Sequence, residues 1–212
     1  MTVSFVLDPP LTDALRAQVV TLWADVTNAG GAVGFVAPVT EETVWPVADA
    51  TLAGVASGVD RMLIGVDGGR LVALLFITDN RFPLKAHWRV LRRVMVVPGS
   101  QGRGYGAALM REAAAVVTRL GLAALQVTVR DGHGLDRFYR GLGYREVGRI
   151  PGALRVAPGD DRDELLMWLD LPQPQEATRA AGSATADTTL GLPQPQEAAR
   201  TGGSPAARAT SV

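Results

Sequence analysis

The residues best suited to chemistry lie together between Val94 and Gly106, in the order V-M-V-V-P-G-S-Q-G-R-G-Y-G. A short β-branched run ends at Pro98, and glycines then alternate at positions 102, 104 and 106 before an alanine-rich helical pattern. Glycine can adopt a positive φ and lets the backbone approach a ligand, so successive N–H groups can face one concavity. The helix that follows adds its positive N-terminal end. Strand, glycine loop and helix together predict a site that binds phosphate.

The glycine string is not a P-loop, because no Lys-Ser or Lys-Thr follows it. Gly102, Gly104 and Ala107 do fit a G-x-G-x-x-A dinucleotide fingerprint, so a dinucleotide-dependent oxidoreductase is one alternative. Four residues separate the apolar strand from Gly102, however, whereas a Rossmann turn follows its strand directly. The spacing therefore favours a cofactor with a nucleotide diphosphate other than NAD. The predicted cofactor-binding residues are Val94, Met95, Val96, Val97, Gln101, Gly102, Arg103, Gly104, Tyr105 and Gly106.

The same stretch resembles the acetyl-CoA signature of the GNAT N-acetyltransferase superfamily, in which Q/R-x-x-G-x-G/A follows the central strand. Phe138 to Tyr144, F-Y-R-G-L-G-Y, resembles the second landmark of that superfamily, F-Y-x-x-x-G-F/Y. Leu22-Trp23, the segment 30–35 and Pro151-Gly152 are similar to its tabtoxin-resistance branch. These matches extend from about Leu22 to Leu171. The resemblance implies acetyl transfer from acetyl-CoA, as cosubstrate, to the amine of a small molecule by direct attack on the thioester.

The resemblance also implies roles for individual residues. A central strand that splays from its neighbour would offer the backbone N–H groups of Val94 to Val97 to the thioester carbonyl and the pantetheine. Tyr139 would protonate the departing thiolate. A phenol with a pKa near ~10 still holds its proton at neutral pH, so it can donate that proton to a thiolate, whose thiol has a pKa near ~8.5. Without the motif around it, Tyr139 is better explained as an amphipathic core residue with a satisfied hydroxyl.

The general base is harder to assign. Many relatives carry a glutamate on the central strand at the position where this sequence has Val90. His87, just before that strand, is the first candidate because an imidazole can accept a proton near pH 7. His133, Asp131 and a route through water are the alternatives. The missing glutamate also leaves open a catalytically weak or inactive CoA-binding regulatory module.

Composition narrows the classes of function. Of the 212 residues, 47% are hydrophobic and 20% charged, which is typical of a soluble globular protein. Basic and acidic residues number 21 each, so nothing favours non-specific binding to nucleic acid. With no cysteine and two histidines, we expect neither a disulfide nor a metal site. No signal peptide or membrane span is indicated, so we expect a cytoplasmic protein whose partner is a small amine, and a homodimer is left open.

These residues need a scaffold, and hydrophobic periodicity predicts one. Strands are expected at 3–8, 61–66, 70–78, 88–97, 122–129, 144–147 and 164–171, and the connection between the last two includes a loop over 150–163. Helices are expected at about 12–30, at 40 to 54 or 58, at 107–120 with Leu120 in its buried stripe, and at 135–142. Asp67-Gly68-Gly69 predicts a tight hairpin. The fold class is α/β (α+β), a GNAT-like mixed and mostly antiparallel sheet with helices on both faces.

Composition changes after Leu171. The nine residues L-P-Q-P-Q-E-A-T-R at 171–179 recur as L-P-Q-P-Q-E-A-A-R at 192–200, among Ala, Gly, Ser, Thr and Pro. Such a segment has no apolar periodicity to bury. We therefore predict an N-acetyltransferase domain at 1–171 and a disordered, low-complexity tail at 172–212.

Overall fold

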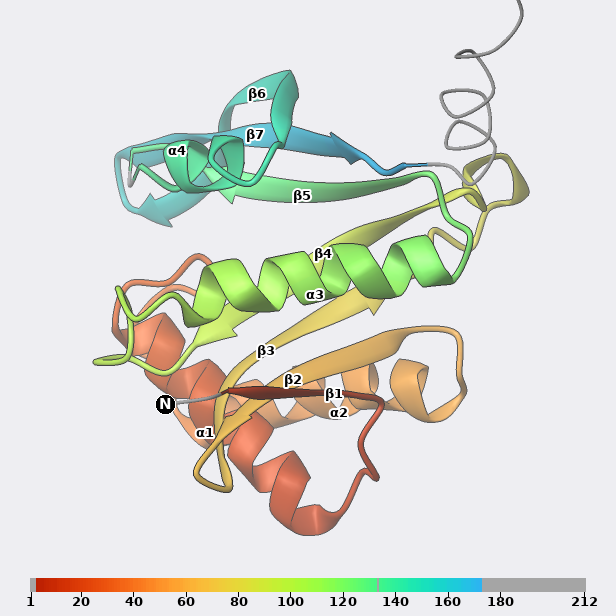
Figure 1. The fold of residues 1–212 in the computed structure, drawn as a ribbon. Helices are drawn as coiled ribbons and strands as arrows, with labels where there is room; N and C mark the ends of the chain where they lie inside the picture. The colour runs from red at the N-terminus through yellow and green to blue at the C-terminus, as the bar shows by residue number, and fades with distance from the viewer. Residues whose placement is uncertain (1–2, 133, 173–212) are drawn as a thin grey trace, which may run out of the picture.

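A computed structural model of the protein describes residues 3–132 and 134–172. Its centre is one sheet with the strand order β1-β2-β3-β4-β5-β7-β6 (Figure 1). Among the strands of the described residues, only the β4–β5 pair is parallel. This confirms the predicted mixed, mostly antiparallel sheet. The strands are β1 Ser4–Leu7, β2 Arg61–Asp67, β3 Arg70–Thr78, β4 Trp88–Val96, β5 Ala124–Arg130, β6 Arg145–Ala157 and β7 Asp160–Asp170.

Helices cover both faces of this sheet, as expected. They are α1 Asp13–Asn28, α2 Glu41–Ala56, α3 Tyr105–Arg119 and α4 Leu135–Arg140, with a 3₁₀ turn, η1, at Pro83–Lys85. Hydroxyls cap the first two, since Thr12 accepts the Leu15 N–H at 3.2 Å and Thr40 accepts the Thr43 N–H at 3.3 Å. No helix in the described part of the chain has the length and apolar character needed to cross a membrane.

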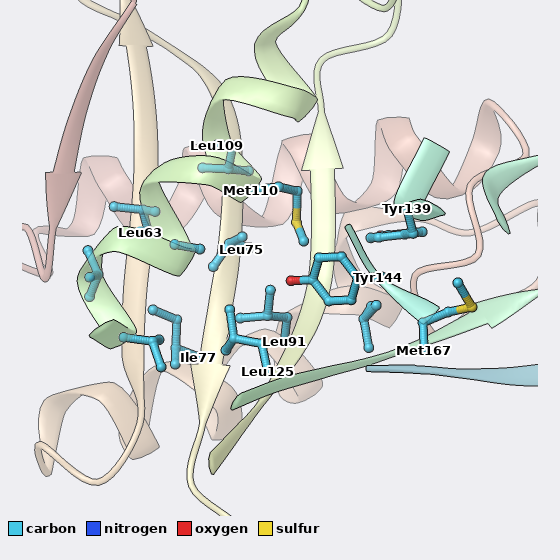
Figure 2. Packing of buried hydrophobic residues seen from close by; sticks show 14 of the residues in the cluster. Leu63, Leu75, Ile77, Leu91, Leu109, Met110, Leu125, Tyr139, Tyr144 and Met167 are labelled. Carbon is cyan, nitrogen blue, oxygen red and sulfur yellow. The ribbon is translucent and has the colours of Figure 1, made fainter. Parts of the chain in front are cut away.

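Two hydrophobic cores lie on opposite faces of the sheet. The first packs α3 and α4 against it and includes Leu109, Met110, Tyr139 and Tyr144 (Figure 2). The second packs α1 and α2 against the other face, with Trp23 fully buried. The Trp23 indole N–H donates to the Val33 carbonyl at 2.8 Å, which satisfies its polar atom in the core.

Two local predictions about turns and helix ends have different outcomes. The Gly68-Gly69 hairpin is confirmed, because both glycines have positive φ, 57° and 78°, as a two-residue type I′ loop requires. The prediction that Leu120 is buried was wrong, since its side chain is 47% exposed. The helix ends at Arg119, so Leu120 lies outside the helix and does not continue its buried face.

The predicted loop over 150–163 was also wrong. The chain there forms most of a long hairpin, the β6–β7 ribbon, which turns at Pro158-Gly159. Charge pairing supports it where apolar alternation is missing: Arg155 contacts Asp161 at 2.7 Å, and Arg149 contacts Asp163 at 2.9 Å. Most side chains of β6 are exposed, so the sequence carries no apolar run that marks this strand.

The described residues include the whole sheet and both cores, and they end one residue after Leu171. Leu171 itself belongs to the first core. The predicted tail, apart from Pro172, lies outside the described residues.

Candidate active site

The site is a gap between the two parallel strands. β4 pairs with β5 from Trp88 to Leu91, opposite Ala124 to Val127, and the pairing stops there. Past this point the strands diverge (Figure 1). A cavity of about 800 Å³ occupies the gap, lined by both strands, the glycine loop, α4 and the segment after α1.

A β-bulge in β4 shapes one wall of the cavity. Met95 pairs with Leu74 and Arg92 with Phe76, so three steps of β4 span two of β3, and Arg93 has a φ of 54°. A bulge adds one residue and so shifts the alternation of side chains. Leu91 and Val94 consequently both face the first core, and the Arg93 side chain turns to the opposite face, over Trp23.

The backbone beyond the bulge presents donors to the gap. The Val97 N–H donates to the Val72 carbonyl of β3 at 2.9 Å. Because N–H groups alternate along a strand, those of Val94 and Val96 point away from β3 and toward the gap. Of the four predicted strand residues, Val94 and Val96 line the cavity. Met95 and Val97 do not, because their side chains pack into the second core.

The glycine loop closes one end of the cavity. Gly102 and Gly104 line it with φ values of 80° and 84°, and Gly104 is the N-cap of α3. The first N–H groups of a helix have no acceptor within the helix, so they are available to a ligand here. Gln101 lines the cavity beside them. Arg103 is exposed and is not among the lining residues.

Gly106 also lines the cavity, from inside α3. Unlike Gly102 and Gly104 it does not adopt the positive φ that glycine allows. A Cβ at this position would lie 3.5 Å from Cζ of Phe138 and 3.6 Å from Val96. Gly106 therefore allows α3, α4 and β4 to pack closely around the cavity.

Tyr105 fixes the start of α3. Its hydroxyl donates to Oδ2 of Asp67 at 2.5 Å, which joins the glycine loop to the β2–β3 turn. That hydrogen bond is the main cause that raises the pKa of Tyr105. Its ring is buried and lines the cavity.

Tyr139 reaches the cavity from α4, on the side of the first core. It is 6% exposed, and its ring lies 5.1 Å from that of Phe138 and 5.6 Å from that of Tyr144, centroid to centroid. Burial raises its pKa, so the hydroxyl keeps its proton at neutral pH. A protonated phenol on a cavity wall can act as a proton donor. The neighbouring Tyr144 hydroxyl is buried without a hydrogen-bond partner among the described residues (Figure 2).

A glutamate that sequence reasoning missed lies on the opposite face. Glu164 of β7 lines the cavity and stands directly across from Arg130 of β5. Among the described lining residues it is the only carboxylate. No motif marks it, and the usable signal was alternation: Leu165 and Met167 are core residues, which leaves Glu164 on the other face of β7.

The predicted bases are placed elsewhere. His87 is exposed before the start of β4, three residues ahead of Val90, and it does not line the cavity. Asp131 forms an ion pair with Arg149 at 2.9 Å, and that contact holds its pKa below the ordinary value. His133 lies outside the described residues. Within the described ranges, no group of three or more His, Asp or Glu residues could hold a metal ion.

Three arginines share the face on which Glu164 lies. Arg92 and Arg93 come from the bulge of β4, and Arg130 comes from the end of β5. Burial is the larger cause that lowers the pKa of Arg93, and the charge of Arg92 adds to it. The cavity therefore has two unlike halves: glycine loop, strand N–H groups and Tyr139 on one side, and charged side chains on the other.

Known proteins resemble this chain in sequence or in fold. Residues 32–144, just over half of the 212, match the model of the Acetyltransferase (GNAT) family. A Brucella melitensis ribosomal-protein-alanine N-acetyltransferase has a TM-score of 0.65 and 18% identity, over 81% of this chain and 100% of its own. The Salmonella typhimurium yncA protein, solved with its cofactor acetyl-CoA, has a TM-score of 0.64 and 18% identity. The match covers 82% of this chain and 95% of the yncA protein. At these identities the structures show a shared fold, and the sequence match shows more: the chain belongs to the acetyltransferase (GNAT) family.

Proposed function

We propose that this protein transfers the acetyl group of acetyl-CoA to the amine of a small molecule. One observation carries the proposal: the gap between β4 and β5 collects the glycine loop, the strand N–H groups, Tyr139 and Glu164 around a single cavity. Acetyl transfer to an amine needs a polarised carbonyl, a proton donor for the leaving thiolate and a proton acceptor for the amine. The cavity supplies a candidate for each.

The residues fit acetyl-CoA. The loop around Gly102 and Gly104 opens onto the cavity, and no atom lies within 4 Å of a Cβ built at either glycine, so a diphosphate has room. The splayed strands leave a slot for the extended pantetheine arm. Bound acetyl-CoA would supply an activated acyl group and a thiolate that leaves readily. The acetyl-CoA complex of the yncA protein, which has the same fold, supports this choice.

The protein's own residues would then act as follows. The Val94 and Val96 N–H groups, on the edge of β4 without a paired strand, donate to the carbonyl oxygen of the thioester. Glu164 accepts the amine proton, directly or through one water molecule. Tyr139, whose hydroxyl is protonated at neutral pH and which lines the cavity, gives a proton to the sulfur as the thiolate departs. His87 has no part in this scheme, because it lies outside the cavity.

The alternatives lose support. A dinucleotide-binding domain uses a parallel, doubly wound sheet, and this sheet has one parallel pair. The inactive CoA-binding module was suggested by Val90, but Glu164 brings a carboxylate to the cavity from another strand. The narrower place in the tabtoxin-resistance branch rests on the sequence resemblance and stays a prediction.

Release of free thiol from acetyl-CoA, followed over a panel of small amines, tests the proposal. We expect release that needs both the protein and an amine, with the N-acetyl product found by mass spectrometry. Titration with acetyl-CoA, CoA and NAD gives the binding control. Tight CoA binding without turnover on any amine would favour the regulatory module, and NAD binding without CoA binding would contradict the proposal.

A further inference from the structure

The charged half of the cavity has an excess of positive charge. Its described residues include Arg92, Arg93 and Arg130, against Glu164 as the one carboxylate. None of these four side chains forms an ion pair with another described residue, whereas many surface arginines of the protein do. Three positive charges lining the cavity against one carboxylate leave an excess of positive charge, which indicates that an anion completes this half.

Arg93 is held in place ready for such an anion. Its guanidinium lies over the ring of Trp23, 5.0 Å from the centroid, and Trp23 is anchored to the Val33 carbonyl. Gly34 leaves room for it, since a Cβ there would lie 3.0 Å from Cζ of Arg93. The Nε atom of Arg93 is buried and has no hydrogen-bond partner among the described residues. Arg93 also lines the cavity, so its charged side chain is held at the cavity wall.

Arg130 repeats this arrangement on the neighbouring strand. One of its terminal nitrogens donates to the Gly30 carbonyl at 2.7 Å, which fixes the guanidinium beside the segment after α1. Its Nε is likewise buried without a partner among the described residues. Two oriented guanidinium groups that both line the cavity suit a carboxylate, which arginine binds through charge-assisted hydrogen bonds.

The position of this pair separates it from the cofactor loop. Gly102, Gly104 and the start of α3 lie at the end of β4, next to the first core. Arg93 lies over Trp23 of the second core, and Arg130 is tied to the segment that follows α1. An anion held there is therefore on the acceptor's side of the gap, near Glu164.

We propose that the acceptor is an amine that also carries a carboxylate, held by Arg93 and Arg130 so that its amine lies toward Glu164. This inference rests on the proposed function and names its substrate class. It predicts that amino acids are acetylated in preference to amines of the same shape without the negative charge.

Matched pairs of acceptors test it. Glycine, β-alanine, 4-aminobutyrate and L-methionine would each be compared with the corresponding carboxamide, because the spacing of amine and carboxylate is open. For at least one pair, we expect kcat/KM for the acid to exceed that for the amide by about 10- to 100-fold, the range of a charge-assisted hydrogen bond. Arg93→Met and Arg130→Met, measured separately, should each reduce that ratio about 10-fold. Because the acid-to-amide ratio of each variant is compared with that of the parent, intrinsic differences in reactivity between the two amines cancel.

Arg111→Met is the control variant, because Arg111 is exposed on α3, lies outside the cavity and carries the same charge. It should leave the ratio unchanged. Arg93 packs on Trp23, so its variant needs a thermal unfolding check, and Arg130→Met is an independent test on another strand. Amides acetylated as well as acids would overturn the inference while the proposed function stands. A higher KM for acetyl-CoA at an unchanged ratio would assign the arginines to the cofactor and overturn it too. Failure of every amine would instead count against the proposed function.

Discussion

At the scale of single residues, Tyr139→Phe separates chemistry from packing. The substitution keeps the ring that contacts Phe138 and Tyr144 and removes only the hydroxyl. If this hydroxyl protonates the thiolate, kcat should fall by roughly 10²- to 10⁴-fold, while acetyl-CoA affinity and Tm stay close to those of the parent. Steady-state kinetics and a binding titration measure both.

Tyr144→Phe is the matched control for this prediction. The Tyr144 hydroxyl is buried beside Tyr139 but has no partner among the described residues and does not line the cavity. Its removal should leave kcat unchanged and stability equal or higher, because an unsatisfied polar group is lost. Parent-like turnover by Tyr139→Phe would show that Tyr139 serves the core alone.

Glu164→Gln tests the assignment of the base. The amide has nearly the same shape but cannot accept the amine proton, so we expect kcat/KM to fall by about 10²-fold or more. His87→Ala is the comparison, because His87 is exposed outside the cavity, and its activity should match the parent. The reverse pattern, with His87→Ala impaired and Glu164→Gln active, would return the role to the histidine.

These residues differ in how far sequence could predict them. The glycine loop and Tyr139 fall in short motifs whose spacing is visible in the chain, and the structure places Gly102, Gly104 and Tyr139 on the cavity. Glu164 stands beside the cavity only because β7 pairs with β5, a contact between distant segments. Arg93 depends on a bulge, which side-chain alternation in the sequence cannot show.

At the scale of elements, the glycine loop can be tested with two equivalent glycines. Gly99 and Gly104 have φ values of 79° and 84°, and a Cβ at either would meet no atom within 4 Å. Alanine at each should therefore cost a similar roughly 1–2 kcal/mol of stability, the penalty for a left-handed conformation. Only Gly104 lines the cavity, so only Gly104→Ala should weaken acetyl-CoA binding in a calorimetric titration. If both variants bound acetyl-CoA with the affinity of the parent, the loop would be an ordinary turn.

The β6–β7 ribbon should respond to acid. Asp163 accepts the Gly152 N–H at 3.0 Å and contacts Arg149, and these partners lower its pKa in the folded state. A carboxyl with a depressed pKa adds stability above its unfolded value of about 3.9 and loses it as pH falls through the folded value. Asp163→Asn should therefore lower Tm near about pH 7, and the difference from the parent should shrink by about pH 3.

Asp25→Asn provides the control for the ribbon, since Asp25 is exposed and its side chain forms no ion pair with another described residue. Its Tm difference should be small at both pH values. A gap between Asp163→Asn and the parent that stays constant from neutral to acid pH would show that the ion pairs do not hold the ribbon. The sequence predicted only the two outer parts of this ribbon, because charge pairs rather than apolar alternation support the part over 150–163.

At the scale of the whole molecule, one parallel strand pair organises the protein. Every other neighbour in the sheet is antiparallel and continuously paired or bulged, while β4 and β5 separate after Val127. The two cores, on opposite faces of the sheet, support this opening, so the cavity is reached by α3 and α4 from one side and by the segment after α1 from the other. Apolar periodicity could predict the elements and the sheet type. It could not predict the point at which the two strands part, because that depends on long-range pairing.

The central claim is that this cavity transfers an acetyl group to an amine, and mass spectrometry of the acceptor tests it most directly. Purified protein would be incubated with acetyl-CoA and a mixture of amino acids and simple amines, with boiled protein and Tyr139→Phe as controls. We expect one or more acceptors to gain a single acetyl group on nitrogen, in step with the release of free CoA, and far more slowly with Tyr139→Phe. Acetyl-CoA that stays intact with every amine, although it binds tightly, would contradict it.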